Sequence, residues 1–418
     1  MRDRHLFISL TANSWGSAAM ARVIADELTG LGDEVLFLVL QSVVPALSGA
    51  SFQCVTLPDH MGPLIGVYLE NILATRKPKT VILADYFGNA NFLFRMGVSS
   101  DCLVPEDALT FAVDAWDCER TGYAVDTTSG HSIQVGPPAG DKASRWHKQF
   151  EGISYKLKPV PMVAPCGSKG RFCTLPNPAT LPVRDRRQWR RRFGFADGDK
   201  AVLFCTNSWQ HQKTDGLFRK QADALPKLLA QHIARLGGSV HLVHVGPQAY
   251  DLGPQLENRY HWLPPLAPSD FESMIAGMDL MVSANISATT IAKAMTYGVP
   301  VVVLQNSTSA ASCEEAEAAA PNQPSAWLKT WLKQAVPLLP FSLWPVGFHR
   351  FLTPLLQDNP YVSALDIVEI LDERRTEATL AGLLFDPGRR EDHLHRQTAY
   401  LDQVRALPTG AQTIKAIC

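Results

Sequence analysis

The amino-acid sequence predicts an α/β protein with two domains, each built on a parallel β-sheet. The chain has 418 residues, of which 46% are hydrophobic and 19% charged, and this is enough for two ordinary cores. Short apolar runs alternate with segments of helical periodicity in both halves, and parallel strands need such crossovers. Between about residues 130 and 182 the alternation fades into a stretch rich in Pro, Gly and Ser, which predicts a linker.

We therefore expect an N-terminal domain with its linker over residues 1–182 and a second domain over 183–385. Residues 386–418 are expected to form C-terminal helices that return toward the first domain. The apolar runs that predict strands of the first sheet cover residues 5–10, 34–40, 80–87 and 109–117. Those of the second sheet lie at 201–209, 239–246, near 260, at 280–283 and at 301–304. Residues 364–373 and 393–408 have the pattern of amphipathic helices.

Charge and cysteine usage narrow the classes of partner and compartment. The chain has 39 Lys+Arg and 40 Asp+Glu, a net charge of -1, so neither nucleic acid nor an anionic membrane is implied. Its eight cysteines are scattered without a Cys-x-x-Cys pair, and its 12 histidines have no ligand-type spacing, so we expect no metal site. No apolar window approaches the roughly 18 residues of a membrane span, and the start lacks a signal-peptide pattern. The expected location is the cytoplasm.

One short stretch, residues 278–306, concentrates small polar side chains where an apolar strand meets a helix. The polar residues are Ser283, Asn285, Ser287, Thr289 and Thr290, and the small Ala288 lies among them. A helix that begins here exposes unpaired N–H groups and the positive end of its dipole, which favours binding of an anion. The alternative is that Ser287 only caps the helix. The position after a parallel strand favours the ligand site.

The run DLMVSANISATTIAKAMTYGVPVVVL, residues 279–304, resembles the donor-binding segment of GT-B glycosyltransferases. The segments VLFCTNSW, VHLVHVGP and YHWLPPLAP follow the order and spacing of the same family, so the resemblance covers most of the second domain. It implies two Rossmann-like domains that face each other across a cleft, with C-terminal helices packing back across both. It also implies a nucleotide sugar on the second domain and a small-molecule acceptor on the first.

Further donor-binding residues follow from this resemblance. Asn207 and Ser208 stand where the first loop of the donor domain meets the diphosphate or sugar, with His211 lining the cleft. His261 and Trp262 stand where the family contacts the base. The alternatives are a turn with packed aromatic side chains and a core tryptophan. Lys293 occupies the position of an acidic ribose ligand, and it either contacts a phosphate or carboxylate of the donor or is a solvated surface lysine.

In the first domain, the resemblance places the acceptor beside the loop after the first strand. The residues there are Asn13, Ser14, Trp15, Gly16 and Ser17. None of these is a base near neutral pH. We therefore expect the catalytic base among the carboxylates at strand ends, which are Asp85, Asp114 and Asp117. The alternative for each is capping of the following helix or turn.

Together these features predict a metal-independent glycosyltransferase in natural-product or glycoconjugate biosynthesis. Backbone N–H groups near Ser287–Thr290 would stabilise the departing diphosphate in place of a metal ion. The substrate would be a UDP-, GDP- or dTDP-sugar, with no further cofactor. Two alternatives stay open: a nucleotide-sugar epimerase of the same fold, and a catalytically silent protein that binds a sugar nucleotide or scaffolds a partner.

Overall fold

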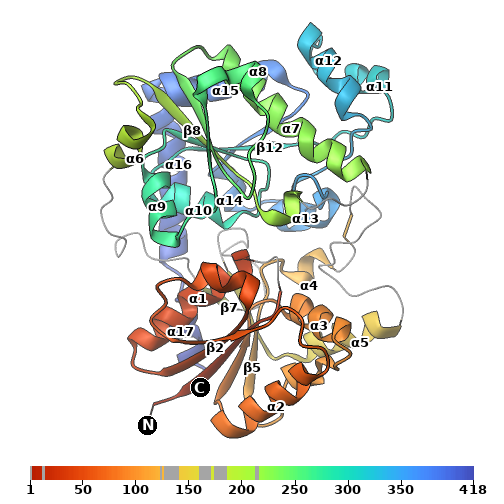
Figure 1. Ribbon diagram of the computed structural model, residues 1–418, viewed down its shortest axis with the longest axis vertical. Helices are drawn as coiled ribbons and strands as arrows, with labels where there is room; N and C mark the ends of the chain where they lie inside the picture. Colours follow the sequence, from red (N-terminus) through yellow and green to blue (C-terminus); the bar gives the residue numbers. More distant parts are fainter. Residues whose placement is uncertain are drawn as a thin grey trace. The chain divides into compact units, whose positions relative to one another are not determined.

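The computed structural model describes residues 2–11, 15–122, 125–126, 141–159, 171–173, 186–211 and 216–418. These residues form two compact units, and Figure 1 shows their elements. Unit 1 contains the described residues within 1–125, 134–180 and 403–418, and unit 2 those within 126–133 and 181–402. None of the described helices combines the length and the apolar character needed to cross a bilayer.

Unit 1 is a seven-stranded sheet in the order β3-β2-β1-β4-β5-β6-β7, with every neighbouring pair parallel. Its strands are β1 (Arg4–Ser9), β2 (Glu34–Leu40), β3 (Gln53–Leu57), β4 (Thr80–Leu83), β5 (Leu109–Val113), β6 (Tyr155–Pro159) and β7 (Arg171–Cys173). Its helices are α1 (Trp15–Gly30), α2 (Leu64–Arg76), α3 (Tyr86–Arg95), α4 (Cys118–Thr121), α5 (Asp141–Gly152) and α17 (Gly410–Lys415). One core lies under α1 and α17, and the other lies under α2, α3 and α5. The central strands β1, β2, β4 and β5 are mostly apolar because helices cover both faces.

Unit 2 is a six-stranded parallel sheet in the order β10-β9-β8-β11-β12-β13. Its strands are β8 (Lys200–Cys205), β9 (Val240–Val245), β10 (Tyr260–Leu263), β11 (Leu280–Ser283), β12 (Val301–Gln305) and β13 (Asp366–Glu369). The helices before β12 are α6 (Arg186–Phe193), α7 (Gly216–Arg235), α8 (Gly253–Leu256), α9 (Pro268–Ala276) and α10 (Thr289–Thr296). Those after it are α11 (Cys313–Ala319), α12 (Ala326–Ala335), α13 (His349–Leu356), α14 (Pro360–Ser363), α15 (Glu373–Phe385) and α16 (Pro387–Arg405).

Three expectations about elements need correction. The helix expected over 364–373 is wrong, because residues 366–369 are strand β13 and pair with the open edge of β12. Four residues with only two apolar side chains, Ile367 and Val368, do not distinguish strand from helix, and tertiary pairing decides. The strand expected over 80–87 ends at Leu83, where Asp85 starts α3. The linker expected over 130–182 instead contains α5, β6 and β7. The helix expected over 393–408 is confirmed over 393–405, which lie in α16.

Both sheets reverse their winding direction after the first strand, which lies between the second and the fourth. In unit 1 this switch point lies between β1 and β4, and in unit 2 between β8 and β11. At a switch point, the loops after two neighbouring strands run to opposite faces of the sheet and leave a crevice between them. Ligands of open α/β sheets bind in this crevice. The fold therefore directs attention to the carboxyl ends of these four strands.

Candidate functional site

The loop after β11 leads into α10 at the switch point of unit 2. The N-cap of α10 is Ala288, which has an extended backbone (φ −65°, ψ 124°) and no side chain that could cap the helix. The backbone N–H groups of Thr289 and Thr290 donate no hydrogen bond within the described part of the chain, and both residues are only partly buried. Unpaired N–H groups at a helix start carry partial positive charge, so this end of α10 can receive an anion.

The polar side chains before α10 hold the loop together and do not cap the helix. The Oδ1 atom of Asn285 accepts hydrogen bonds from the backbone N–H of Ser287 at 3.0 Å and from its hydroxyl at 2.7 Å. The hydroxyl of Ser283 donates to the carbonyl of Asn285 at 2.9 Å. The alternative that Ser287 is the N-cap is therefore wrong. The two serine hydroxyls are already engaged in the turn, which leaves the backbone N–H groups and the hydroxyls of Thr289 and Thr290 as donors.

The loop after β8 lies across the switch point and presents Asn207 and Ser208, both exposed. Gln210 fixes this loop, because its Oε1 accepts from the N–H of Asn207 at 2.7 Å and its Nε2 donates to the carbonyl of Trp344 at 2.8 Å. Trp344 in turn donates its N–H to the carbonyl of Ala284 at 2.8 Å. The residues around Trp344 thus join the two loops of the switch point, a role that the aromatic, proline-rich sequence did not suggest.

His211 ends the same loop and belongs to a buried polar cluster. Its Nε2 lies 2.8 Å from Oγ1 of Thr206, which lies 2.8 Å from Nε2 of His244. Nδ1 of His244 lies 2.9 Å from the hydroxyl of Tyr260, and the ring of Tyr250 stacks on His211. Burial lowers the pKa of His211 to about 4 and that of His244 to about 3, so both imidazoles are neutral near pH 7.

The sequence drew attention to His211 but not to its partners. A signal was present: His244 interrupts the apolar run of β9, and a polar side chain inside a buried strand needs a hydrogen-bonding partner. Its partner Thr206 directly follows β8, the neighbouring strand.

Two other donor candidates, His261 and Trp262, lie on strand β10. His261 is 3.1 Å from His241 and contacts the rings of Phe193 and Phe195, so it belongs to an aromatic cluster beside α6. Trp262 is 40% exposed, and its Nε1 donates to the carbonyl of Gly246 at 3.0 Å. This bond fixes the indole and leaves part of its surface open.

Lys293, in the middle of α10, forms an ion pair with Glu272 of α9 at 2.9 Å. The hydroxyl of Tyr297 donates to the other oxygen of Glu272 at 3.4 Å. The lysine thus has an acidic partner within the unit, which accounts for its charge without a ligand.

In unit 1 the switch point brings Asp85 beside the loop after β1. Asp85 is the N-cap of α3, with Oδ1 accepting from the N–H of Gly88 at 2.9 Å, and the hydroxyl of Thr11 lies 3.4 Å from Oδ2. A Cβ atom on Gly88 would lie 2.1 Å from Oγ1 of Thr11 and 2.5 Å from Oδ2 of Asp85, so only glycine fits. Burial raises the pKa of Asp85, although both hydrogen bonds oppose the shift.

The acceptor candidates of unit 1 lie only partly inside the described residues. Trp15, Gly16 and Ser17 form the first turn of α1 and are partly buried. Asn13 and Ser14 lie outside the described residues. α1 is the element that follows β1 in the chain, so its first turn belongs to the same switch point as Asp85.

The two remaining carboxylates follow β5. Both oxygens of Asp114 accept from the N–H of Cys118, at 3.2 and 3.1 Å, and burial raises the pKa of Asp114 to about 6. Asp117 instead forms a buried ion pair with Lys158 at 2.7 Å, and each side chain is only 1% exposed. Asp114 keeps the chemistry of a proton acceptor, whereas Asp117 is neutralised by a lysine and serves the structure of unit 1.

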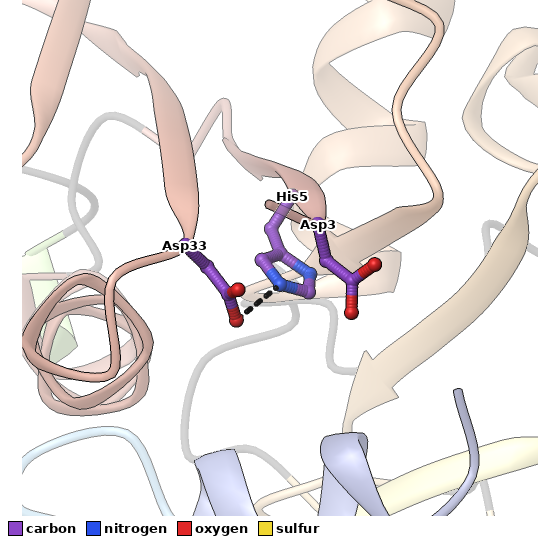
Figure 2. Close-up of side chains that lie close together, drawn as sticks. All are labelled: Asp3, His5 and Asp33. Carbon is purple, nitrogen blue, oxygen red and sulfur yellow. Dashed lines mark hydrogen bonds and ion pairs between the residues drawn. The ribbon is translucent and has the colours of Figure 1, made fainter. Parts of the chain in front are cut away.

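Asp3, His5 and Asp33 form a group with metal-type geometry, in which the ligand atoms lie within 4.8 Å of one another (Figure 2). The carboxylates are already neutralised, since Lys415 lies 2.6 Å from Asp33 and 3.0 Å from Asp3, and Lys79 lies 3.0 Å from Asp3. The group stands where β1 begins, at the opposite end of the sheet from the switch point. Its role is to fasten α17 to the sheet.

Two parallel sheets of this order, each with a polar switch point, are those of a GT-B-type α/β fold, and solved structures of that fold resemble the chain. The spinosyn forosaminyltransferase SpnP shares 14% identity at a TM-score of 0.53, covering 100% of this chain and 98% of its own. The spinosyn rhamnosyltransferase SpnG in complex with thymidine diphosphate shares 13% identity at a TM-score of 0.52, and the match covers 100% of both chains. A Listeria monocytogenes protein assigned as a UDP-N-acetylglucosamine 2-epimerase shares 10% identity at a TM-score of 0.55. That match covers 100% of this chain and 96% of the Listeria chain.

The chain belongs to a family of unknown function (DUF6365), which matches residues 24–418. No curated protein sequence matches the chain. At 10–14% identity, the similarity to the solved structures shows the fold and leaves activity to be argued from the residues.

Proposed function

We propose that this protein is a glycosyltransferase that moves a sugar from a nucleotide-sugar donor to a small-molecule acceptor. The observation that carries the proposal is the pair of unpaired backbone N–H groups, of Thr289 and Thr290, at the switch point of unit 2. A dinucleotide or nucleoside diphosphate has its negative charge in the diphosphate, and helix starts at this position bind such groups. The similarity in fold to SpnP and SpnG supports this choice of ligand class and a natural-product acceptor.

In this proposal the N–H groups of α10 do more than bind the donor. Negative charge builds on the diphosphate as the bond to the sugar breaks, and fixed donors stabilise that charge without reorganisation. We propose that these donors replace a metal ion, so that neither a metal nor another cofactor is required. The exposed Asn207 and Ser208, across the switch point, supply further polar contacts to the diphosphate or sugar.

We assign the proton transfer to Asp85 of unit 1. As the acceptor hydroxyl attacks the anomeric carbon, its proton passes to Oδ2 of Asp85, the oxygen that holds only the long bond to Thr11. A carboxylate whose pKa is raised by burial is a better base than one in water, and positioned bases contribute about 10²–10⁴-fold to a rate. Asn13, Ser14, Trp15, Gly16 and Ser17 are proposed to border the acceptor. The scattered cysteines remain our reason for placing the protein in the cytoplasm.

The proposal is tested by removing one backbone donor of α10 with Thr289→Pro. Proline is tolerated at the first position of a helix, and Ala288 already has the extended backbone that a residue before proline prefers. Loss of one charge-assisted hydrogen bond should weaken binding of UDP, GDP or TDP, whichever binds best, by about 10- to 100-fold in calorimetry.

Two controls separate the donor from other effects. Thr289→Val keeps the N–H group and should bind as the wild type does. Ala326→Pro makes the same change at the first residue of α12, whose N-cap is Ser325, and should leave affinity unchanged. Equal nucleotide affinity of Thr289→Pro and wild type would contradict the anion site. An altered sugar released from a nucleotide sugar without any acceptor would favour the epimerase instead.

A further inference from the structure

The buried cluster around Thr206 has a definite direction of hydrogen bonding. Nε2 of Gln248 lies 2.8 Å from Nδ1 of His211, and an amide nitrogen can only donate, so Nδ1 accepts. The neutral His211 then carries its proton on Nε2 and donates it to Oγ1 of Thr206. The hydroxyl of Thr206 has a single proton, which it donates in a hydrogen bond to Nε2 of His244. The Nδ1–H group of His244 donates in turn to the hydroxyl oxygen of Tyr260.

The other end of this chain of bonds is anchored in the backbone. The hydroxyl oxygen of Tyr260 accepts from the backbone N–H of Tyr250 at 3.0 Å, which agrees with its role as acceptor from His244. The four bonds from Gln248 to Tyr260 are thus all donated toward Tyr260, whose oxygen also accepts from the backbone. The side chains from His211 to Tyr260, which we call the relay, hold the Gln248 amide with its nitrogen toward His211.

Gln248 is exposed, and its carbonyl oxygen has no hydrogen-bond partner within the described residues. Because the relay takes the amide nitrogen, the group that remains for solvent or a ligand is an acceptor. An amide oxygen repels phosphate oxygens and attracts N–H or O–H groups. The chemistry of this position is therefore complementary to a nucleoside and opposed to a diphosphate.

Gly246 links the relay to a second exposed group of the same sheet edge. A Cβ atom at this position would lie 2.2 Å from Oγ1 of Thr206 and 2.6 Å from Nε2 of His244. The carbonyl of Gly246 accepts from Nε1 of the exposed Trp262 at 3.0 Å. One glycine thus packs against the relay and holds an aromatic ring, the usual partner of a nucleobase face.

We propose that Gln248 recognises the nucleoside part of the ligand, its Oε1 accepting a hydrogen bond from an N–H or O–H group, with the relay as the device that orients it. This inference rests on the proposed function, since it names the part of the nucleotide sugar that β9 and its loop would bind. The anion goes to α10 and the nucleoside to the loop after β9. Gln248 is the specificity residue, and Thr206 and His244 are positioning residues.

The experiment compares nucleotide and inorganic pyrophosphate binding in calorimetry. Gln248→Ala should weaken binding of the tightest of UDP, GDP and TDP by about tenfold, which is the usual size of one hydrogen bond, and leave pyrophosphate affinity unchanged. Gln323→Ala removes an exposed glutamine elsewhere in unit 2 and should change neither. The 2′-deoxy or ribo counterpart of that nucleotide then separates a ribose hydroxyl from a base N–H as the group recognised.

Thr206→Val tests the relay, because valine has the shape of threonine without the hydroxyl. It should reduce the ratio of nucleotide affinity to pyrophosphate affinity, as Gln248→Ala does. The double variant with Gln248→Ala should lose no more nucleotide affinity than either single variant. Thr206→Ser should restore the ratio, and because the ratio is measured on folded protein, a lower melting temperature does not affect the comparison.

The outcomes also separate this inference from the function on which it rests. Wild-type protein that binds neither nucleotide nor pyrophosphate overturns both. Nucleotide binding that Gln248→Ala leaves unchanged overturns the inference alone. Additive losses in the double variant overturn the orienting role of the relay.

Discussion

The carboxyl edges of the two sheets have the same plan and opposite chemistry. In each unit a threonine follows the first strand, Thr11 or Thr206, and contacts a titratable side chain beside a glycine that has no room for a Cβ atom. In unit 1 that side chain is the carboxylate of Asp85. In unit 2 it is an imidazole, and the loop after β11 contains no acidic residue.

Burial shifts the pKa values of acidic and basic side chains in opposite directions at the two edges. Loss of water disfavours the charged form, so it raises the pKa of Asp85 and Asp114 and lowers that of His211 and His244. Unit 1 thereby holds Asp114, whose pKa of about 6 allows proton exchange near neutral pH, and Asp85, whose pKa is shifted in the same direction. Unit 2 holds neutral imidazoles and free N–H groups, and the loop that leads into α10 has no negative charge to oppose a diphosphate.

The largest expected effect tests the proton-accepting role of unit 1. Asp85→Asn keeps an oxygen to cap α3 but removes the base, so kcat should fall by about 10²–10⁴-fold with nucleotide affinity unchanged. Turnover is measured as nucleotide release in the presence of an accepted acceptor, and affinity by calorimetry. Asp117→Asn does not serve as a control, because it breaks the buried pair with Lys158. Unchanged kcat in Asp85→Asn would move the base to Asp114 or remove it from unit 1.

The second effect is a difference in the pH dependence of stability. The folded pKa of Asp114, about 6, lies above that of an unfolded aspartate, so its contribution is present below about pH 4 and is lost as pH rises to about 6. The folded pKa of His244, about 3, lies below that of an unfolded histidine, so its contribution is present above about pH 6.5 and is lost on acidification. The two slopes have opposite signs.

Two variants should therefore change the pH profile in opposite directions. Removing Asp114 with Asn should raise the free energy of unfolding at pH 7 relative to pH 4 by about 3 kcal/mol, from a shift of roughly two pKa units. Removing His244 with Asn should lower the same difference by a similar amount, about 3 kcal/mol over this pH range. Urea unfolding at the two pH values measures both. Parallel profiles for the two variants would contradict the contrast between the edges.

The sequence predicts more of the fold than of the candidate site. Apolar runs and helical spacing were sufficient for the two parallel sheets, because strands buried on both faces need such composition. The position of Thr289 and Thr290 followed from the strand-to-helix pattern alone. The relay did not follow, since Thr206, His244 and Tyr260 are 38 and 16 residues apart along the chain, and only pairing of β8, β9 and β10 brings them together. The short strand β13 was missed for the same reason.

The smallest expected effect concerns Lys293, where the chain departs from the family it resembles. Its ion pair with Glu272 is partly exposed, with 29% and 18% of the side chains accessible, and exposed pairs contribute about 0–1 kcal/mol. Lys293→Ala should therefore lower the free energy of unfolding by less than about 1 kcal/mol and leave nucleotide affinity within about twofold of wild type. Glu272→Ala is the matched variant, since it frees the lysine. Nucleotide binding that weakens tenfold in Lys293→Ala and tightens in Glu272→Ala would instead make the lysine a phosphate ligand on α10.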